Sequence, residues 1–408
     1  MIREHLPNAT IGFHMHIPFP TSEIFRVLPW RREILKGMLA ADFIGFQIPA
    51  HAHHFVHCCT RVLLGTSGTA TQITYRGHVT RLLVCPVGVD VRRLRTMQRR
   101  RAVREKATVL QKRFKHQQSR FVIVGVDRCV QISGIVQKLM AFEEFLFRYP
   151  KFSDLVVLVQ IVLPMNSNTG SEASKKMGKN LRRRINQVVG RTNARFAKIT
   201  SASRPIYCQH QELGSDDLLG LYETADCVFV TPVKEGMNTV PFEYLVCRDN
   251  RGLTGTVIVS EFAGCASSLS GALIVNPAST DAMATSIAEA LVMNEKERAQ
   301  RHVQMTSIAT KFTAQNWLNI STDLLDIVLK MKENELKQAG SQKELDKLTP
   351  DVLGRAFVAR SCLSIPSAQS SGSEEREVEV VELEERVMEV VEEVVEEVDA
   401  AFYHEWRR

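Results

Sequence analysis

The sequence holds 408 residues, of which 44% are hydrophobic and 24% are charged. This length predicts two domains, because a typical domain holds roughly 100–200 residues, and the composition is ordinary for a soluble globular protein. No apolar run reaches the roughly 20 residues that span a bilayer, and residues 1–7 lack the apolar core and cleavage site of a secretory signal. We therefore expect a cytoplasmic protein with no membrane partner.

The sequence contains nine cysteines, an odd number, and none of them belongs to a Cys-x-x-Cys pair. Most lie inside apolar segments, which favours buried, reduced thiols over a disulfide framework or a zinc site. We therefore expect no structural metal.

The net charge of +7 is unevenly distributed along the chain. Residues 371–408 contain 14 acidic and 4 basic side chains, so that this tail carries −10 and the remainder carries +17. The Glu/Val-biased tract follows a serine-rich stretch, which is typical of a linker with an appended, solvated segment. There are two alternatives. The tract could form a short helix with valines along one face, or it could fold against the basic remainder of the chain and neutralise its charge. We assign residues 336–408 to this linker and tail.

The first hundred residues contain few segments that read as strands. Apolar runs predict strands at residues 11–16, 43–47 and 82–87, and helical spacing predicts helices at residues 22–40 and 50–64. Three strands make a thin sheet, so we expect residues 1–118 to form a partial Rossmann-like domain. Its sheet should show exposed apolar edges where further strands belong.

From residue 119 onward, short β-branched runs alternate with helical patterns. The runs cover residues 121–126, 155–162, 206–208, 227–231, 256–260 and 273–275. Helical patterns at residues 135–148 and 172–198 separate them. Continuous apolar strands between amphipathic helices predict an α/β domain over residues 119–335, with a parallel sheet covered on both faces. Ligands of such sheets bind beyond the carboxyl ends of the strands.

Residues 92–120 hold twelve Lys or Arg and one acidic residue. Basic stripes of this kind can neutralise the phosphates of a nucleic acid. No aromatic platform or known nucleic-acid motif accompanies the stripe, so it predicts a solvated basic helix and no nucleic-acid partner.

The most informative loop covers residues 231–243, Thr-Pro-Val-Lys-Glu-Gly-Met-Asn-Thr-Val-Pro-Phe-Glu. It follows a buried strand and opens a helix, where free N–H groups of residues 237–240 and the helix dipole suit a pyrophosphate. Glu235 and Glu243 are positioned to accept hydrogen bonds from sugar and ribose hydroxyls. Arg128 leaves another strand and either pairs with phosphate in fork geometry or forms an ordinary surface ion pair. Neither a P-loop nor a His-Glu-x-x-His motif occurs, which disfavours a P-loop NTPase or a zincin.

Six segments of the sequence read Ile-Gly-Phe-His-Met-His-Ile-Pro-Phe-Pro-Thr-Ser-Glu-Ile-Phe (11–25), Gly-Val-Asp-Arg (125–128), Val-Leu-Val-Gln-Ile (157–161), Glu-Gly-Met-Asn (235–238), Phe-Glu-Tyr (242–244) and Ser-Glu-Phe-Ala-Gly (260–264). They occur in the order found in trehalose-6-phosphate synthases, which the chain resembles from residue 1 to about residue 329. These enzymes are retaining glycosyltransferases of the GT-B type, with two Rossmann-like domains that face a cleft. The sequence that follows Asn238 resembles that of the plant and algal branch of the family, several members of which are regulatory.

The resemblance implies transfer of glucose from UDP-glucose to glucose 6-phosphate in trehalose biosynthesis, with no metal and no cofactor. It assigns catalysis to Arg128, which would stabilise the leaving diphosphate, and to His16, which would contact the donor sugar. A buried core histidine is the alternative for His16. The substrate-binding residues that it implies are Glu235, Gly236, Met237, Asn238, Thr239, Val240 and Glu243. Stabilising the charge of the leaving group is the main demand on such a site.

Three departures from the family pattern make activity doubtful. Ser133 stands where the family has a phosphate-binding lysine, and Asn166 stands where it has an acceptor arginine, with Lys175 and Lys176 nearby as possible substitutes. The family also carries a further N-terminal segment, so we expect a truncated and divergent member. The chain is therefore either a weak synthase or an inactive regulatory subunit that binds sugar nucleotide, in a homo- or hetero-oligomer with synthase subunits.

Overall fold

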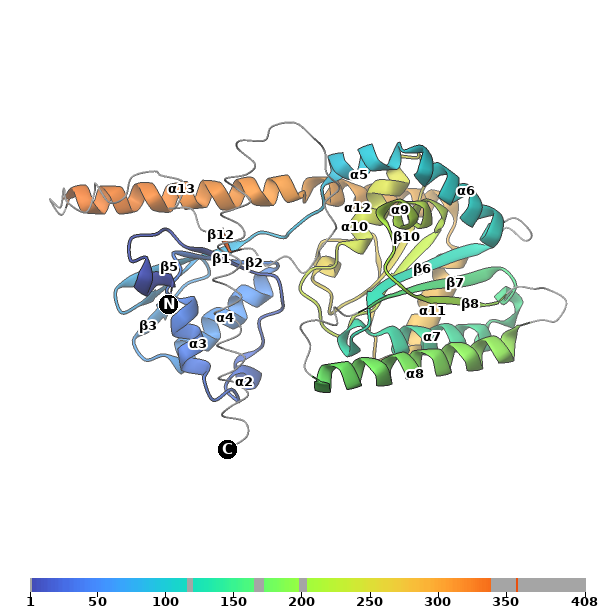
Figure 1. The fold of residues 1–408 in the computed structure, drawn as a ribbon, viewed down its shortest axis with the longest axis horizontal. Coiled ribbons are helices and arrows are strands. Elements are labelled where there is room, and N and C mark those ends of the chain that lie inside the picture. The colour runs from blue at the N-terminus through green and yellow to red at the C-terminus, as the bar shows by residue number, and fades with distance from the viewer. Residues whose placement is uncertain (1, 116–119, 165–171, 198–203, 339–356, 359–408) are drawn as a thin grey trace. The chain divides into compact units, whose positions relative to one another are not determined.

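The computed structural model describes residues 2–115, 120–164, 172–197, 204–338 and 357–358 (Figure 1). The chain divides into two units, residues 1–360 and residues 361–408. The second unit lies outside the described residues, and so do both alternatives for the acidic tail, the valine-striped helix and the cover for the basic body. The two sheets described below belong to the first unit.

The first sheet has the strand order β12-β1-β2-β5-β4-β3. Its strands are β1 (Gly12–Met15), β2 (Phe43–Phe46), β3 (Thr66–Gly68), β4 (Gln72–Tyr75), β5 (His78–Val84) and β12 (Phe357–Val358). Strands β1, β2 and β5 are parallel, as expected, while β3 and β4 add an antiparallel extension. The expectation of three strands was therefore wrong for residues 12–84, and the edge strand β3 is short and polar.

The turn between β4 and β5 explains why the antiparallel strands β3 and β4 were not predicted from the sequence. Arg76 and Gly77 have φ angles of 51° and 84°, and Tyr75 pairs directly with His78. Two consecutive positive φ angles define a two-residue hairpin turn, which Asn-Gly or Asp-Gly normally marks. Arg-Gly is a weaker signal for such a turn.

The helices beside the first sheet are α1 (Ile2–His5), α2 (Ser22–Phe25), α3 (Arg31–Met38) and α4 (Pro49–Val62). The single helix expected at residues 22–40 is divided in two. Pro29 lies between α2 and α3, and a proline disfavours helical conformation in the residue before it. The helix expected at residues 50–64 is confirmed as α4, displaced by one or two residues.

The second sheet is parallel throughout and has the order β11-β10-β9-β6-β7-β8. Its strands are β6 (Phe121–Arg128), β7 (Val156–Leu163), β8 (Ile206–His210), β9 (Cys227–Val230), β10 (Thr256–Ser260) and β11 (Leu273–Val275). All six predicted runs are confirmed as strands. Successive β6 residues point to opposite faces, so that Val122 and Val124 enter one hydrophobic core while Phe121 and Ile123 enter another.

Helices cover both faces of this sheet, as the sequence predicted (Figure 1). One core is closed by α5 (Val91–Gln98), α6 (Arg101–Lys115), α9 (Ser215–Thr224), α10 (Val240–Asp249) and α12 (Glu295–Lys311). The other is closed by α7 (Ile135–Arg148), α8 (Glu172–Phe196) and α11 (Thr280–Val292). Three 3₁₀ turns, η1 (Gln131–Ser133), η2 (Pro150–Phe152) and η3 (Gly264–Ser267), complete the described connections of this region.

The basic stretch at residues 92–115 forms α5 and α6 and is partly neutralised. Lys106 lies 2.7 Å from Asp217, and Arg100 lies 3.5 Å from Asp216, both on α9. These ion pairs lie at the surface, with the Lys106 and Arg100 side chains 52% and 56% exposed, as a solvated basic stretch would have them.

The two longest helices in the described residues are α8 and α13 (Ala314–Gln338), with 25 residues each. In the described part of the chain, no helix combines the length and apolarity that crossing a membrane requires. Helix α13 contacts the first sheet, since the Lys332 ammonium lies 2.7 Å from the Asp42 carboxylate and the Trp317 indole N–H donates to His14 Nδ1 at 3.4 Å.

The eight described cysteines are free thiols. Seven are buried and Cys208 is partly buried. Burial raises the pKa of several of them, for example that of Cys208 to about 11. Reduced, buried thiols were expected, and the described cysteines agree; Cys362 lies outside the described residues.

Candidate functional site

The predicted site residues of the second sheet gather at the carboxyl ends of its strands. Arg128 is the last residue of β6 and is exposed, while Glu235 lies in the loop after β9. Glu235 forms an isolated parallel bridge with Ala263, and its N–H donates to the Phe262 carbonyl at 3.2 Å. The loops after β9 and β10 are therefore joined just beyond the sheet.

Gly236 lies where two backbone segments approach too closely for a side chain. A Cβ atom at this residue would lie 1.9 Å from the His16 carbonyl oxygen, and a Cβ at Gly264 would lie 1.8 Å from the Gly236 oxygen. Only glycine fits such an approach without displacing the backbone. The contact places His16, the residue directly after β1, against the loop of Glu235.

Asn238 fixes the shape of this loop. Its Nδ2 donates to Glu235 Oε2 at 2.8 Å, and its Oδ1 accepts the Val240 N–H at 2.9 Å. Asn238 thereby connects the carboxylate to the first residue of α10. Sequence analysis expected the N–H groups of residues 237–240 to be free for a ligand. The Val240 N–H is already bonded, so that expectation is wrong for Val240.

Glu235 lies among charged groups. Burial raises its pKa from the ordinary value to about 7, and the nearby carboxylate of Asp127 acts in the same direction. The hydrogen bond from Asn238 and the positive charges of Arg128 and Lys138 oppose this increase. At neutral pH the carboxyl is therefore divided between its protonated and ionised forms.

Lys138 and Asp127 form a buried ion pair beneath the loop. The ammonium lies 2.5 Å from the Asp127 carboxylate, and the two side chains are 0% and 4% exposed. Gln160 Nε2 also donates to this carboxylate at 2.8 Å. A Cβ at Gly125 would lie 2.7 Å from the Lys138 nitrogen, which explains the glycine on β6. Sequence analysis missed Lys138, although a lysine within the apolar pattern of α7 was a signal.

Glu243 has neutral hydroxyl donors and forms no ion pair with any residue in the described part of the chain. Tyr222 Oη donates to Oε2 and Thr239 Oγ1 donates to Oε1, each at 3.2 Å. Burial raises the pKa of Glu243. Each carboxylate oxygen keeps a second acceptor position for a ligand. Tyr222, a buried residue of α9, was not predicted because its contact with Glu243 depends on how α9 packs against α10.

His16 presents a polar atom that has no partner among the residues that the structure describes. The side-chain oxygen Oε1 of Gln47 accepts a hydrogen bond from the Val87 N–H at 2.9 Å. This bond directs the side-chain nitrogen Nε2 of Gln47 toward His16 Nδ1, 3.2 Å away. An amide NH₂ only donates, so Nδ1 accepts and the imidazole proton lies on Nε2. Among the described residues His16 Nε2 has no hydrogen-bond partner, and burial lowers the pKa of the ring. His16 is therefore a neutral imidazole with a free N–H.

The positions that depart from the family pattern are only partly visible. Ser133 ends η1 and is followed by Gly134, whose φ of 68° and close approach to the Thr231 carbonyl oxygen require glycine. A neutral hydroxyl thus stands next to the loop after β9. Asn166 and the side chain of Lys175 lie outside the described residues, while Lys176 is exposed on α8.

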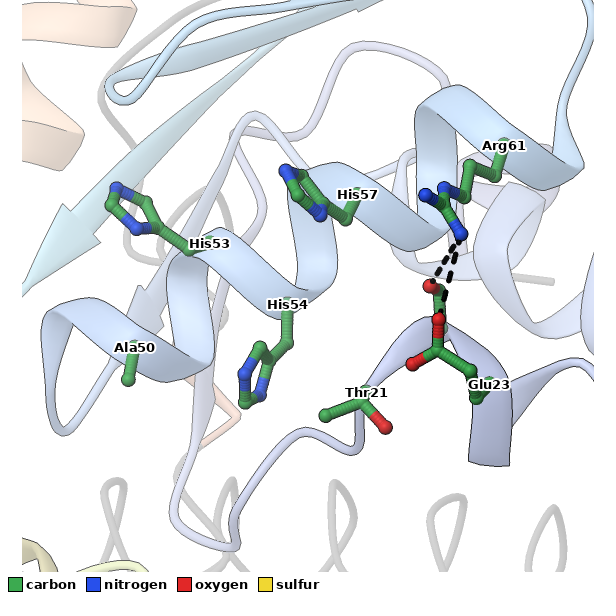
Figure 2. A pocket seen from close by; sticks show the side chains of 8 residues that line it. Thr21, Glu23, Ala50, His53, His54, His57 and Arg61 are labelled. Atoms are coloured by element: carbon green, nitrogen blue, oxygen red, sulfur yellow. Dashed lines mark hydrogen bonds and ion pairs between the residues drawn. The ribbon is translucent and has the colours of Figure 1, made fainter.

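A pocket of about 410 Å³ lies between α2 and α4 (Figure 2). Its lining residues are Thr21, Ser22, Glu23, Ala50, His53, His54, His57 and Arg61. In Figure 2, Arg61 points toward Glu23, and the two side chains lie 3.6 Å apart. The pocket shares no lining residue with the predicted site.

Comparison with known proteins identifies the family. The sequence profile of Glycosyltransferase family 20 matches residues 1–326. The chain is 38% identical over 324 residues to the UDP-forming α,α-trehalose-phosphate synthase of Yarrowia lipolytica, covering 78% of this chain and 66% of that protein. It is 37% identical over 317 residues to the enzyme of the same name from Schizosaccharomyces pombe, covering 78% of this chain and 59% of that protein.

Solved structures agree with the sequence comparison. The UDP-forming α,α-trehalose-phosphate synthase of Burkholderia xenovorans, in complex with glucose-6-phosphate, has a TM-score of 0.71 at 30% identity, covering 78% of this chain and 68% of that one. The N-terminal domain of Candida albicans trehalose-6-phosphate phosphatase has a TM-score of 0.72 at 32% identity, covering 80% of this chain and 66% of that one. The chain spans about 59–66% of the length of the two curated relatives. It belongs to glycosyltransferase family 20 and has the α/β, GT-B fold of the trehalose-phosphate synthases.

Proposed function

We propose that this chain binds UDP-glucose at the carboxyl edge of its second sheet and transfers glucose to glucose 6-phosphate. The observation that carries the proposal is the gathering of Arg128, Glu235 and Glu243 at that edge, with His16 against the same loop. The names of the relatives, UDP-forming trehalose-phosphate synthases, supply the reaction.

Arg128 is the residue that we propose for the diphosphate. Of the two cations that act on Glu235, Lys138 is already paired with Asp127, whereas the Arg128 guanidinium is exposed. A guanidinium offers two parallel N–H donors to phosphate oxygens, and its charge stabilises the leaving group of the transfer.

Glu243 and His16 are proposed to hold the two sugars of the donor. Glu243 keeps an acceptor position on each oxygen for the ribose hydroxyls, while Tyr222 and Thr239 fix its orientation. The free Nε2–H of His16 is a donor for a hydroxyl of the transferred glucose. Gly236 and Met237–Val240 would line the part of the site that lies between the ribose and the transferred glucose of the donor.

Ser133 favours weak activity and a second candidate function. It provides no positive charge beside the loop after β9, and removing one stabilising group from such a site costs about 10²–10³ in rate. A regulatory subunit that binds sugar nucleotide without efficient transfer is therefore the alternative. In either case we propose a cytoplasmic protein that associates with copies of itself or with other synthase subunits.

The test is release of UDP from UDP-glucose with glucose 6-phosphate as the acceptor. We expect turnover well below ordinary enzyme values of about 1–10³ s⁻¹ and a marked increase in the Ser133→Lys variant. Ser307→Lys adds the same charge at an exposed position of α12 and serves as the control. Ordinary turnover by the unmodified chain would contradict the reduced activity. No UDP-glucose binding by the folded chain would contradict the proposed function itself.

A further inference from the structure

The imidazole of His16 belongs to a cluster of three rings. The ring centroid of His14 lies 4.8 Å from that of His16. The indole of Trp317, from α13, lies 5.3 Å from the His14 ring and 6.1 Å from the His16 ring. His14 and His16 are two residues apart on β1 and its continuation, so both side chains leave the same face of the first sheet. We call these three residues the three-ring cluster.

Helix α13 brings Trp317 to this cluster because the helix is also anchored near the start of β1. The Lys332 ammonium lies 2.7 Å from the Asp42 carboxylate and 3.3 Å from the Ala9 carbonyl oxygen. Trp317 contacts His14, which comes later along the strand, so α13 runs antiparallel to β1. Buried residues of α13 between these two contacts include Ser321, Leu325 and Val328. The docking of the whole helix therefore sets the position of the Trp317 ring.

His14 is fixed by a neighbour from another strand and by α13. It pairs with Gly45 of β2, where a Cβ atom would lie 2.2 Å from His14 Nδ1. The Trp317 indole N–H donates to the same Nδ1 at 3.4 Å, with the two rings at 88°. Because an indole N–H only donates, Nδ1 accepts and the neutral ring carries its proton on Nε2. Burial lowers the pKa of His14 to about 3, which agrees with a neutral ring.

A histidine at this position carries a cost that an apolar ring would not. The residue is 3% exposed, and among the described residues His14 Nε2 has no hydrogen-bond partner. A buried N–H without a partner loses its hydration with nothing in return. A phenylalanine ring would avoid this loss but could not accept the Trp317 N–H. The advantage of the imidazole over an apolar ring is therefore its contact with Trp317.

The orientation of the His16 ring depends on the other two rings. The Gln47 amide nitrogen donates to His16 Nδ1 at 3.2 Å. A single hydrogen bond tolerates a range of ring orientations. His14, whose plane is tilted by 53° to the His16 ring, and Trp317, tilted by 48°, restrict that range. They therefore help to set the direction of the free Nε2–H.

We propose that His14 and Trp317 are positioning residues for the transferred sugar, because they hold the His16 imidazole so that its Nε2–H meets a hydroxyl of the hexose of a nucleoside diphosphate sugar. The inference rests on the proposed function, since it requires the hexose to lie beside His16. Both residues act through His16 and do not touch the ligand. Because we place the diphosphate at Arg128 and the ribose at Glu243, the effect is confined to the hexose.

Calorimetric titrations of the full chain with UDP-glucose, and with UDP, which lacks the hexose, test this role. His14→Phe should weaken the binding of UDP-glucose about 2–10-fold, the range of an oriented aromatic contact, and leave the affinity for UDP unchanged. Its free energy of unfolding in urea should be equal or higher, because the buried unpaired donor is gone. Trp317→Phe should also weaken UDP-glucose alone. The double variant should lose no more than the sum of the single variants, because the two residues act through one contact.

Two further variants serve as references. His16→Ala removes the hexose contact itself, so it should weaken the binding of UDP-glucose at least as much as His14→Phe and leave UDP unchanged. His302→Phe replaces another buried histidine with an unpaired ring nitrogen, on α12, and should change neither affinity.

The outcomes separate this inference from the proposed function. Unchanged UDP-glucose affinity in both His14→Phe and Trp317→Phe, or equal losses for UDP and UDP-glucose, would overturn the positioning role alone. If His14→Phe does not fold, Trp317→Phe decides between these results. No binding of either nucleotide by the folded unmodified chain would overturn the proposed function, and the inference with it.

Discussion

Glu235 and Glu243 stand at the two ends of one loop, yet their surroundings differ. Burial raises the pKa of both carboxyls. Glu235 lies among the charges of Asp127, Arg128 and Lys138, whereas Glu243 is held by the hydroxyls of Tyr222 and Thr239. A carboxyl among charges responds to an arriving ion, because its protonation depends on the local balance. A carboxyl held by neutral donors stays a fixed acceptor.

The difference begins in the secondary structure beneath each residue. Glu235 lies over the ends of β6 and α7, where a buried lysine and aspartate form an ion pair. Glu243 is a partly buried residue of α10 and faces Tyr222 of α9, which belongs to a hydrophobic core. The loop and the first turn of α10 thus contain one charge-sensitive position and one insensitive position.

The largest expected effect comes from breaking the ion pair on the Glu235 side. Lys138→Met leaves the buried Asp127 carboxylate without its cation, and such a loss typically costs about 3–5 kcal/mol of stability. Urea denaturation measures the change. Arg95→Met removes a partner of the exposed pair with Asp249 and should have little effect. Adding Asp127→Asn to Lys138→Met should restore part of the loss; failure to do so would contradict the pairing.

Removing the exposed cation affects binding and leaves stability nearly unchanged. Arg128→Ala should weaken the binding of UDP-glucose about 10–100-fold, because a hydrogen bond to a charged group contributes about 1.5–3 kcal/mol. Calorimetry measures the affinity, and Arg92→Ala, at an exposed position of α5, is the control. Equal affinities for the two variants would remove Arg128 from the diphosphate site.

On the Glu243 side the expected loss is similar or smaller. Glu243→Ala should weaken the binding of UDP by about 1–3 kcal/mol, the usual cost of leaving bound hydroxyls without an acceptor. Tyr222→Phe removes only the orienting donor and should cost less. An unchanged UDP affinity in Glu243→Ala would remove this residue from the ribose site.

The smallest effect is a pH dependence of stability in the absence of ligand. The folded-state pKa of Glu235, about 7, lies above the ordinary value of 4.5, so the folded protein binds more protons than the unfolded chain at intermediate pH. Its stability therefore decreases as pH rises from about 5 to 8, by roughly 1–2 kcal/mol through this group. Urea denaturation at several pH values should show this decrease in the native chain and a smaller one in Glu235→Gln. Parallel curves would place the pKa of Glu235 near its usual range.

The regions of the molecule differ in how far the sequence predicted them. The strands of the second sheet were predictable because their β-branched runs are buried on both faces and bounded by helical patterns. The hairpin at Arg76 and Gly77 was not, because nothing in that dipeptide demands positive φ angles at both residues. Domain boundaries at residues 118 and 335 stay predictions.

The candidate site was likewise predicted only in part from the sequence. Motifs in the strand-to-helix loops indicated Arg128, Glu235 and Glu243, since such loops meet at one edge of a parallel sheet. The ion pair of Lys138 with Asp127 joins residues of β6 and α7 whose contact depends on packing. Packing between elements also determines which carboxyl is surrounded by charge, so the contrast between Glu235 and Glu243 was beyond sequence analysis.

The most direct test of the account compares donor and acceptor binding to the same chain. Calorimetric titrations with UDP-glucose and with glucose 6-phosphate, under identical conditions, measure both affinities. We predict that UDP-glucose binds more tightly, because the described donor residues are in place, whereas Asn166 stands where the family has an acceptor arginine. Tighter binding of glucose 6-phosphate, or no binding of UDP-glucose by folded protein, would contradict a donor site at the carboxyl edge of the second sheet.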